Sequence, residues 1–211
     1  MPEILDAPLA AYLDGLVPER PAELRDMEAY AKQHDFPIVG PACAHIGYQV
    51  ARMIGARRIF ELGSGYGYST AFFARAVGKG GQVFYTDGSE ENARRAKGYL
   101  ERMGFGDRVA IKVGDAVTSL EATTGYYDVI FIDVDKDGYP AALQAAAPRV
   151  RRGGYLLADN VLWSGKVVDS GVSDAATEGI RTFNKRLFSL EEFRSVIVPL
   201  RDGVAIARRL E

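Results

Sequence analysis

The sequence predicts an α/β fold: a doubly wound, mostly parallel sheet of seven strands with one antiparallel strand near the C-terminus. From Ile59 onward, short apolar runs alternate with helical patterns, which is typical of a parallel sheet. Glycines at 63, 65 and 67 follow the first run, as in sheets that bind nucleotides. Two final apolar runs, separated by a turn containing Asp202-Gly203, indicate a β-hairpin. The hairpin is the observation that predicts one reversed strand.

Composition and charge predict a single globular domain over residues 1–211, with a helical lead-in over 1–40. Hydrophobic residues make up 47% and charged residues 26% of the chain, as in an ordinary globular enzyme. A formal net charge of −2 attracts neither nucleic acid nor an anionic membrane, so we expect neither as a partner. After Met1 there is no basic segment, and no apolar run is long enough to span a bilayer, so neither a signal peptide nor a transmembrane helix is expected. The single cysteine, Cys43, fits a reducing cytoplasm.

Hydrophobic periodicity predicts the individual elements. A short helix is expected near 9–16, a second from Pro21 until His34-Asp35-Phe36-Pro37 ends it, and a third over 42–55. Gly153-Gly154 is expected to precede the fifth strand. The predicted strands lie at 59–62, 82–87, 108–113, 127–133, 155–159, 193–199 and 204–207, and the helices between them at 72–77, 89–103, 139–151 and 174–188.

The stretch from Arg58 to Ser69 predicts a cofactor site. A buried strand, a glycine turn and a helix N-terminus form a cradle in which the backbone can approach a ligand and offer it free N–H groups. Glu61 stands two residues before the first glycine, and Asp87 follows Gly67 by twenty residues, where a ribose-binding carboxylate is expected. A glycine turn alone is common for structural reasons. Together with both acids it predicts a nucleoside cofactor.

A second polar cluster is expected where the fourth and fifth strands end. Asp133 follows one strand and Asp159-Asn160 the other. The first, fourth and fifth strands should be neighbours, so these side chains would converge at the carboxyl edge of the sheet. Two carboxylates and an amide oxygen suit Mg²⁺ or another hard divalent ion. Lys136 could serve there as a general base, because a nearby cation disfavours its ammonium form. Taken singly, each acid could equally be a helix cap or a solvated loop residue.

These motifs resemble a known family. Glu61 to Ser69, Glu-Leu-Gly-Ser-Gly-Tyr-Gly-Tyr-Ser, resembles motif one of the class I methyltransferases that use S-adenosylmethionine. Ile132 to Asp137, with Asp159 to Gly165, resembles the cation-dependent O-methyltransferases, which include catechol O-methyltransferase and the plant caffeoyl-CoA O-methyltransferases. The resemblance extends from about Val39 to the closing hairpin. It implies the Rossmann-like fold of class I methyltransferases and an S-adenosylmethionine-dependent enzyme.

The resemblance also implies a role for each site residue. Ser69 would lie near the carboxylate end of S-adenosylmethionine, Val39 near its methionine part and Asp87 at the ribose. Asp115 and Ala116 would lie at the adenine. Lys136, as the base, and Asp133 would be the catalytic residues, and Asp133 would adjoin both the cofactor and the metal. The implied cofactor-binding set is Val39, Glu61, Gly63, Ser64, Gly65, Gly67, Ser69, Asp87, Asp115, Ala116 and Asp133, and the implied ligands of a divalent cation (Mg²⁺, with Mn²⁺ or Ca²⁺ as alternatives) are Asp133, Asp159 and Asn160.

The implied reaction is methyl transfer to one hydroxyl of a small aromatic vicinal diol, in an enzyme expected to be a homodimer. Trp163 could wall the acceptor pocket or simply pack. The animal catechol enzyme places an acid near its penultimate strand, and Ser195 to Val198 supply none. The acceptor therefore stays open among catechols, caffeoyl-type esters, flavonoids and quinone precursors.

Three other functions compete with this prediction. An NAD-type oxidoreductase could use the same glycine turn, but the reversed strand and the convergent set of Asp133, Asp159 and Asn160 count against it. A non-catalytic cofactor-binding protein would be expected to lose some of these residues or Lys136. Methylation of nucleic acid is disfavoured by the near-neutral charge.

Overall fold

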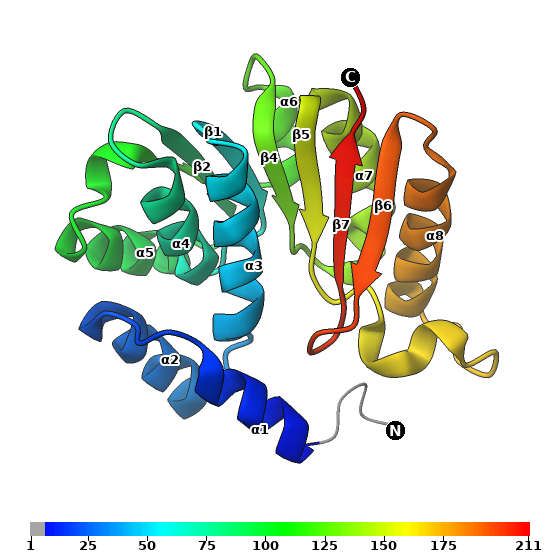
Figure 1. The fold of residues 1–211 in the computed structure, drawn as a ribbon, viewed down its shortest axis with the longest axis horizontal. Coiled ribbons are helices and arrows are strands. Elements are labelled where there is room, and N and C mark those ends of the chain that lie inside the picture. The colour runs from blue at the N-terminus through cyan, green and yellow to red at the C-terminus, as the bar shows by residue number, and fades with distance from the viewer. Residues whose placement is uncertain (1–6) are drawn as a thin grey trace.

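A computed structural model describes residues 7–211, and it places a seven-stranded sheet between two layers of helices (Figure 1). The first six residues of the predicted lead-in, including the start at Met1 on which the signal-peptide prediction rests, lie outside the described part. The strands are β1 Arg58–Leu62, β2 Gln82–Asp87, β3 Val109–Val113, β4 Tyr127–Ile132, β5 Val150–Ala158, β6 Phe193–Val198 and β7 Val204–Arg209. The α-helices are α1 Ala7–Leu16, α2 Ala22–His34, α3 Gly40–Met53, α4 Tyr68–Val77, α5 Glu90–Arg102, α6 Ala116–Glu121, α7 Tyr139–Ala146 and α8 Ala175–Ser189. Four 3₁₀ turns complete the described chain: η1 Gly106–Arg108, η2 Lys136–Gly138, η3 Ala147–Arg149 and η4 Trp163–Val168.

The strand order confirms the predicted sheet. It runs β3-β2-β1-β4-β5-β7-β6, with parallel pairing from β3 to β5. β7 is antiparallel to both β5 and β6, so it is the one reversed strand. β1, β4 and β5 are adjacent, and hydrogen bonds continue the ladder past their ends. The Asp133 N–H donates to Leu62 O (2.8 Å), and the Asp159 N–H donates to Ile132 O (3.2 Å). The chain segments that follow these strands therefore begin side by side.

Two apolar cores lie on opposite faces of the sheet. One packs α2, α3, α4 and α5 against it, and the other packs α6, α7 and α8. In α4 every residue except Arg75 is buried, because the helix lies between α3 and the sheet. Burial of this apolar surface on both faces is the main stabilising contribution and explains why the central strands are almost wholly apolar.

Side-chain caps begin three of the helices. Ser89 Oγ accepts from the Asn92 N–H (3.2 Å) at the start of α5, as the sequence predicts. Asp174 caps α8 through the Thr177 N–H (3.0 Å). Asp115 caps α6, a short helix that the sequence analysis did not predict. Such caps satisfy backbone donors that have no partner within the helix.

Two predicted boundaries are wrong. The helix predicted over 139–151 ends at Ala146, and the chain tightens into η3, which contains Pro148. Proline lacks an N–H and its ring clashes with the preceding turn, so the α-helix cannot continue through it. β5 begins at Val150, so Gly153-Gly154 lie within the strand rather than before it. The β4–β5 register shifts there, between Tyr127 and Val129, and Gly153 takes a φ of 73°, as in a bulge.

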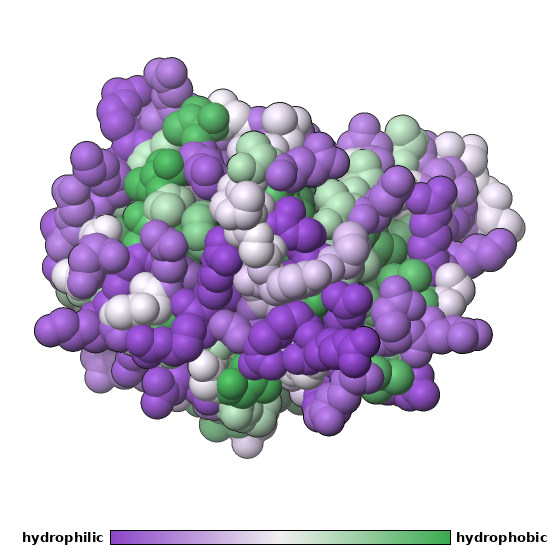
Figure 2. All heavy atoms as spheres, turned by 90° about the horizontal axis from the view of Figure 1, so that it is seen from above, coloured by the Kyte–Doolittle hydropathy of each residue, from purple (hydrophilic) through white to green (hydrophobic). Residues whose placement is uncertain are grey.

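The two ends of the molecule differ. The carboxyl ends of the parallel strands lie at the bottom of Figure 1, close to the β6–β7 turn and the start of α3. Figure 2 shows the opposite end from above, where hydrophilic residues predominate and apolar residues form separate patches. Among residues 7–211, no helix combines the length and the apolar character needed to cross a membrane.

Candidate active site

The glycine turn lies directly against the end of β4. Gly63, Gly65 and Gly67 have φ values of 83°, 52° and 92°, which glycine adopts without steric cost. A Cβ at Gly63 would lie 2.2 Å from the backbone oxygen of Asp133, so a side chain at this position would collide with the β4 end. Gly67 immediately precedes α4, whose first N–H groups face the turn region. The turn and Asp133 are thus brought together as the sequence predicts.

Glu61 lies beneath this turn and is fully buried. Its Oε2 accepts hydrogen bonds from Thr70 Oγ1 (2.5 Å) and Ser64 Oγ (3.4 Å). Its Oε1 is buried and has no partner among the described residues. Burial raises the pKa of Glu61 to about 7, against the opposing effect of the hydroxyls of Ser69, Thr70 and Ser64. A buried acceptor without a donor fits a bound ligand that brings a donor of its own.

The other predicted cofactor residues lie at or just after the ends of β2 and β3. Asp87 Oδ1 accepts from the Ser89 N–H (2.8 Å) and from Asn92 Nδ2 (3.0 Å), so this carboxylate is held in place at the end of β2. Asp115 is exposed, and its pKa is lowered by the hydrogen bond from the Thr118 N–H (2.7 Å). Its side chain therefore serves as a helix cap, next to the buried Ala116.

A small enclosed cavity joins the predicted cofactor and metal residues. Val39, Ser69 and Asp159 all line it, together with Cys43 and Phe131. Its volume of about 10 Å³ leaves room for roughly one water molecule. The structure thus brings together three residues that are far apart in the sequence and that were predicted to bind the methionine part of the cofactor or the metal.

Lys136 begins η2, four residues after β4 ends at Ile132, and is held by three oxygen atoms. Its Nζ donates to Asp133 Oδ1 (2.8 Å), to Val134 O (3.2 Å) and to the hydroxyl of Tyr139 (3.2 Å). The Tyr139 hydroxyl in turn donates to Asp159 O (2.8 Å). Burial and the carboxylates of Asp133 and Asp159 raise the pKa of Tyr139 well above its ordinary value, so this hydroxyl stays protonated. The buried Tyr139 hydroxyl therefore links the predicted base, Lys136, to the backbone of Asp159, a predicted metal ligand.

Asp159 and Asn160 complete the edge. Asp159 is 2% exposed, and its Oδ1 accepts from the Asn160 N–H (2.9 Å). Burial, followed by repulsion from Asp133, raises the pKa of Asp159. Asn160 has a φ of 55°, an uncommon backbone conformation that is often found at functional sites. Two carboxylates that repel one another, with Asn160 next in the chain as a source of an amide oxygen, fit a hard divalent cation. No group of three His, Cys, Asp or Glu side chains suited to a metal occurs within residues 7–211, so the metal stays a prediction.

Sequence reasoning missed two further residues at this edge. Asp202 is half-buried, its backbone oxygen accepts from the Leu162 N–H (2.9 Å), and its carboxylate accepts from the Ser164 N–H. Burial raises its pKa, and Lys136 opposes that shift. In the sequence, Asp202 indicates only a turn. Tyr139 was missed as well, although its position three residues after Lys136 allows contact.

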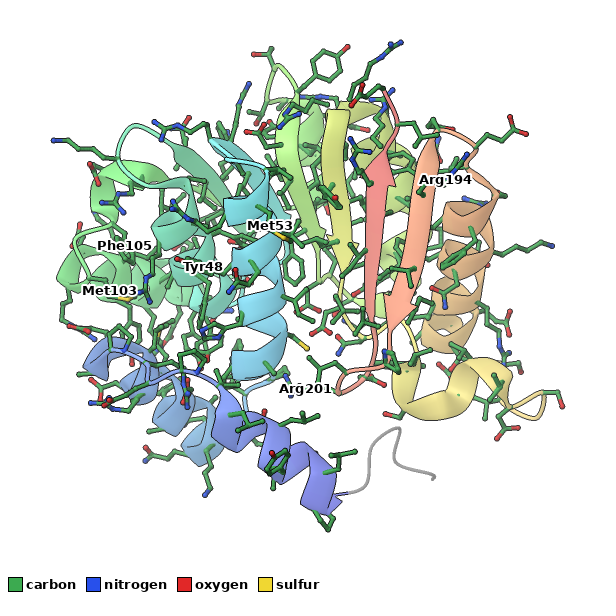
Figure 3. All side chains as sticks on the ribbon, in the orientation of Figure 1. Tyr48, Met53, Met103, Phe105, Arg194 and Arg201 are labelled. Atoms are coloured by element: carbon green, nitrogen blue, oxygen red, sulfur yellow. The ribbon has the colours of Figure 1, made fainter. Side chains whose placement is uncertain are left out.

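Arg201 joins the β6–β7 turn to the segment before α3. It extends from the β6–β7 turn toward the start of α3, where its Nη1 donates to Ile38 O (3.0 Å) (Figure 3). A Cβ on Gly40 would lie 2.4 Å from that nitrogen, so glycine leaves the space that the guanidinium occupies. The turn is thereby fastened to the segment that carries Val39.

The reversed seventh strand, the glycine turn after β1 and the acids at the strand ends define a class I methyltransferase. Comparison with known proteins agrees. The O-methyltransferase family model matches residues 18–210. The catechol O-methyltransferase of Niastella koreensis is 34% identical over 167 residues, covering 75% of this chain and 76% of that protein. Tricin synthase 1 of Oryza sativa is 28% identical, covering 92% and 84%.

Solved structures give the same result. An O-methyltransferase from Bacillus cereus, determined in complex with SAH, superposes with a TM-score of 0.87 at 28% identity and covers 96% of this chain and 97% of that one. TomG of Streptomyces achromogenes, determined with SAM, gives 0.86 at 26% identity, covering 97% and 96%. The chain belongs to the O-methyltransferase family of class I, S-adenosylmethionine-dependent enzymes.

Proposed function

We propose that this enzyme transfers a methyl group from S-adenosylmethionine to one hydroxyl of a small aromatic vicinal diol, a catechol or a caffeoyl-type compound, with the assistance of a divalent cation. The observation that carries the proposal is the contact of Lys136 Nζ with Asp133 Oδ1 (2.8 Å), at the strand end that abuts the glycine turn. A candidate base, a candidate metal ligand and the cofactor turn therefore share one edge. The names of relatives that act on catechol and caffeoyl-CoA support this acceptor class.

Each part of the edge has a role in the proposal. The glycine turn, Glu61 and Asp87 would hold S-adenosylmethionine, with the unpartnered Glu61 Oε1 accepting a donor from it. Asp133, Asp159 and Asn160 would hold the cation. When bound, the cation supplies positive charge that favours the ionised form of a neighbouring hydroxyl, and S-adenosylmethionine supplies the methyl group.

Lys136 would accept the proton of the acceptor hydroxyl as the neutral amine, which donates two hydrogen bonds rather than three and so keeps a lone pair for that proton. Its Nζ is held by fixed oxygen atoms on three sides, so its position is set before the acceptor arrives. Asp133 and the Tyr139 hydroxyl orient it, and the oxygen atom that loses the proton then attacks the methyl group in line. Positioning and electrostatics are the protein's main contributions to such a reaction.

The test is transfer of label from S-adenosylmethionine to a panel of catechols and caffeoyl compounds, measured with Mg²⁺ and with EDTA. We expect transfer that EDTA abolishes, and that Lys136→Ala and Asp133→Ala each reduce strongly. Transfer that survives EDTA would remove the cation from the proposal. Undiminished transfer by Lys136→Ala would remove the proposed base. The absence of any transfer to vicinal diols would overturn the acceptor class.

A further inference from the structure

The acceptor loop, defined as residues 160–173 between β5 and α8, adopts an unusual backbone. Asn160, Trp163 and Ser164 all have positive φ values, of 55°, 47° and 52°. Non-glycine residues persist in this conformation only where their surroundings hold them there. The loop therefore depends on contacts from outside itself.

The first part of the loop is held by the β6–β7 hairpin. The Val161 N–H donates to Gly203 O (3.1 Å) and the Leu162 N–H donates to Asp202 O (2.9 Å). On the other side, Asn184 Nδ2 of α8 donates to Val161 O (2.8 Å). These bonds end before residue 166.

The second part of the loop is held by one side chain, Arg181 of α8. Its guanidinium donates to the backbone oxygens of Lys166 (2.9 Å), Val167 (3.0 Å) and Val172 (2.7 Å), and to that of Asp169. Within residues 7–211, no other side chain from outside the loop donates to the carbonyls of 166–172. An arginine side chain can bind all four carbonyls because its planar guanidinium carries five N–H donors.

α8 also contacts the turn that carries the proposed base. A Cβ on Gly179 would lie 2.2 Å from Lys136 O, so the helix packs directly on η2. Arg181 lies two residues further along the same helix. One helix thus contacts both the base turn and the acceptor loop.

The position of the loop matters for the site because of what it carries. It begins at Asn160, and Trp163 follows three residues later with its Nε1 buried and without a partner among the described residues. Lys166 Nζ lies 5.3 Å from the centre of the Trp163 ring, within the range of a cation–π contact. Since Arg181 binds the oxygen of Lys166, it fixes the backbone from which this contact is made.

We propose that Arg181 is a positioning residue that holds the acceptor loop in the conformation seen in the structure and so determines how well the acceptor binds and reacts. This inference rests on the proposed function, because it assigns the loop to the acceptor side of the site. It assigns Arg181 no part in binding the cofactor, for which the glycine turn is the proposed site.

The first measurement reports the loop without any substrate. Trp163 is the only tryptophan in the chain, so its emission and its quenching by acrylamide report this loop alone. We expect Arg181→Ala and Arg181→Lys to increase quenching, since one ammonium cannot reach four carbonyls. Arg186→Ala is the matched control, because Arg186 is exposed on the same helix, and we expect it to leave quenching unchanged. Unchanged Trp163 quenching in folded Arg181→Ala and Arg181→Lys would overturn the proposal.

The second measurement separates positioning from folding. We expect kcat/KM for the acceptor to fall about 10- to 100-fold in Arg181→Ala, while the Kd of S-adenosylmethionine by calorimetry stays within about twofold. Millimolar guanidinium should restore part of the loss, and the same concentration of NaCl should not. A parallel loss of cofactor affinity would overturn the proposal. If wild-type enzyme methylates no diol, the proposed function fails, and the fluorescence comparison still decides the role of Arg181.

Discussion

At the Lys136 amine, position is determined by groups that do not themselves react. The Tyr139 hydroxyl has one proton and donates it to Asp159 O, so toward Lys136 it can only accept. The direction of the whole chain of bonds, from Lys136 through Tyr139 to Asp159, is therefore fixed. A base oriented in this way requires little rearrangement during the reaction.

Tyr139→Phe should reduce turnover without abolishing the fold. The change removes the hydroxyl that accepts from Lys136 and donates to Asp159 O, and leaves the ring that packs against Phe183. We expect kcat to fall about 10- to 100-fold and stability to fall by about 1 kcal/mol for the lost hydrogen bonds. Steady-state kinetics and urea unfolding measure both. Tyr126→Phe, at an exposed tyrosine, should change neither, and a Tyr139→Phe enzyme with wild-type kcat would refute the role.

Glu61 should make the stability of the ligand-free protein depend on pH. Its folded pKa is raised to about 7, chiefly by burial, so between the ordinary range of a glutamate and pH 7 the folded state binds the proton more tightly than the unfolded state. The free energy of unfolding therefore falls as pH rises through about 7. A tenfold difference in proton affinity between the two states corresponds to about 1.4 kcal/mol, so the effect is at most a few kcal/mol.

Urea unfolding of wild type and Glu61→Gln at pH 5, 6, 7 and 8 checks this dependence. We expect the two unfolding free energies to diverge in favour of the glutamine variant as pH rises. Asp133 raises the pKa of Glu61 further, and three hydroxyls oppose that rise, but these neighbours are the same in both proteins. Parallel curves across the whole range would show that Glu61 does not titrate as described.

At the scale of elements, α8 and α5 offer a matched pair of helical glycines. Gly179→Ala would place a Cβ 2.2 Å from Lys136 O, so the η2 turn must move. Gly98 of α5 has nothing within 4 Å of its added Cβ. We expect Gly98→Ala to stabilise the protein by about 0.5–1 kcal/mol through helix propensity. We expect Gly179→Ala to destabilise it and to lower kcat.

Thermal unfolding and kinetics of the two alanine variants distinguish local strain from a general effect of substitution. Both changes add one methyl group to a helix, so a common response would contradict the argument. Gly98→Ala should retain wild-type kcat. An active, stabilised Gly179→Ala variant would show that the contact between α8 and η2 is not as tight as the structure has it.

The elements that the sequence predicted well are those with strong local signals. Ser89 with acids behind it predicted the start of α5, and Asp202-Gly203 predicted the hairpin turn. The start of β5 was predicted too late because two adjacent glycines, Gly153-Gly154, are locally typical of a turn before a strand. Its place in a strand depends on pairing with β4, which is a long-range contact. The end of α7 was missed because the α-helical pattern was extended through Pro148.

At the scale of the whole molecule, the site was predictable where topology alone brings residues together. Parallel strands end at one edge, so Asp133 and Asp159-Asn160 had to lie near the glycine turn once the strand order was known. Arg181 was not predictable in this way. Its partners are backbone carbonyls, whose positions depend on the loop conformation. Every residue has a carbonyl, so the residue types of 166–172 do not indicate these contacts.

Ligand binding should stabilise the whole molecule, because the proposed cofactor and cation sites draw on segments that converge only in the folded chain. A ligand at 100 times its Kd adds about 2.7 kcal/mol. For a domain of this size each kcal/mol raises Tm by about 2–4 °C. We therefore expect saturating S-adenosylhomocysteine to raise Tm by roughly 5–10 °C. Mg²⁺ should add a further rise that EDTA reverses.

Asp159→Asn tests whether the Mg²⁺-dependent rise in Tm comes from a cation bound at Asp133, Asp159 and Asn160. The substitution keeps the shape of the side chain and an oxygen that can accept from the Asn160 N–H, and it removes one of the two carboxylates. Weaker attraction for a cation should reduce the Mg²⁺-dependent rise in Tm and leave the rise with S-adenosylhomocysteine intact. An unchanged Mg²⁺ response in this variant would place the cation elsewhere. Because Asp159 also lines the cavity shared with Val39 and Ser69, loss of both responses would instead show that the two sites are one cooperative unit.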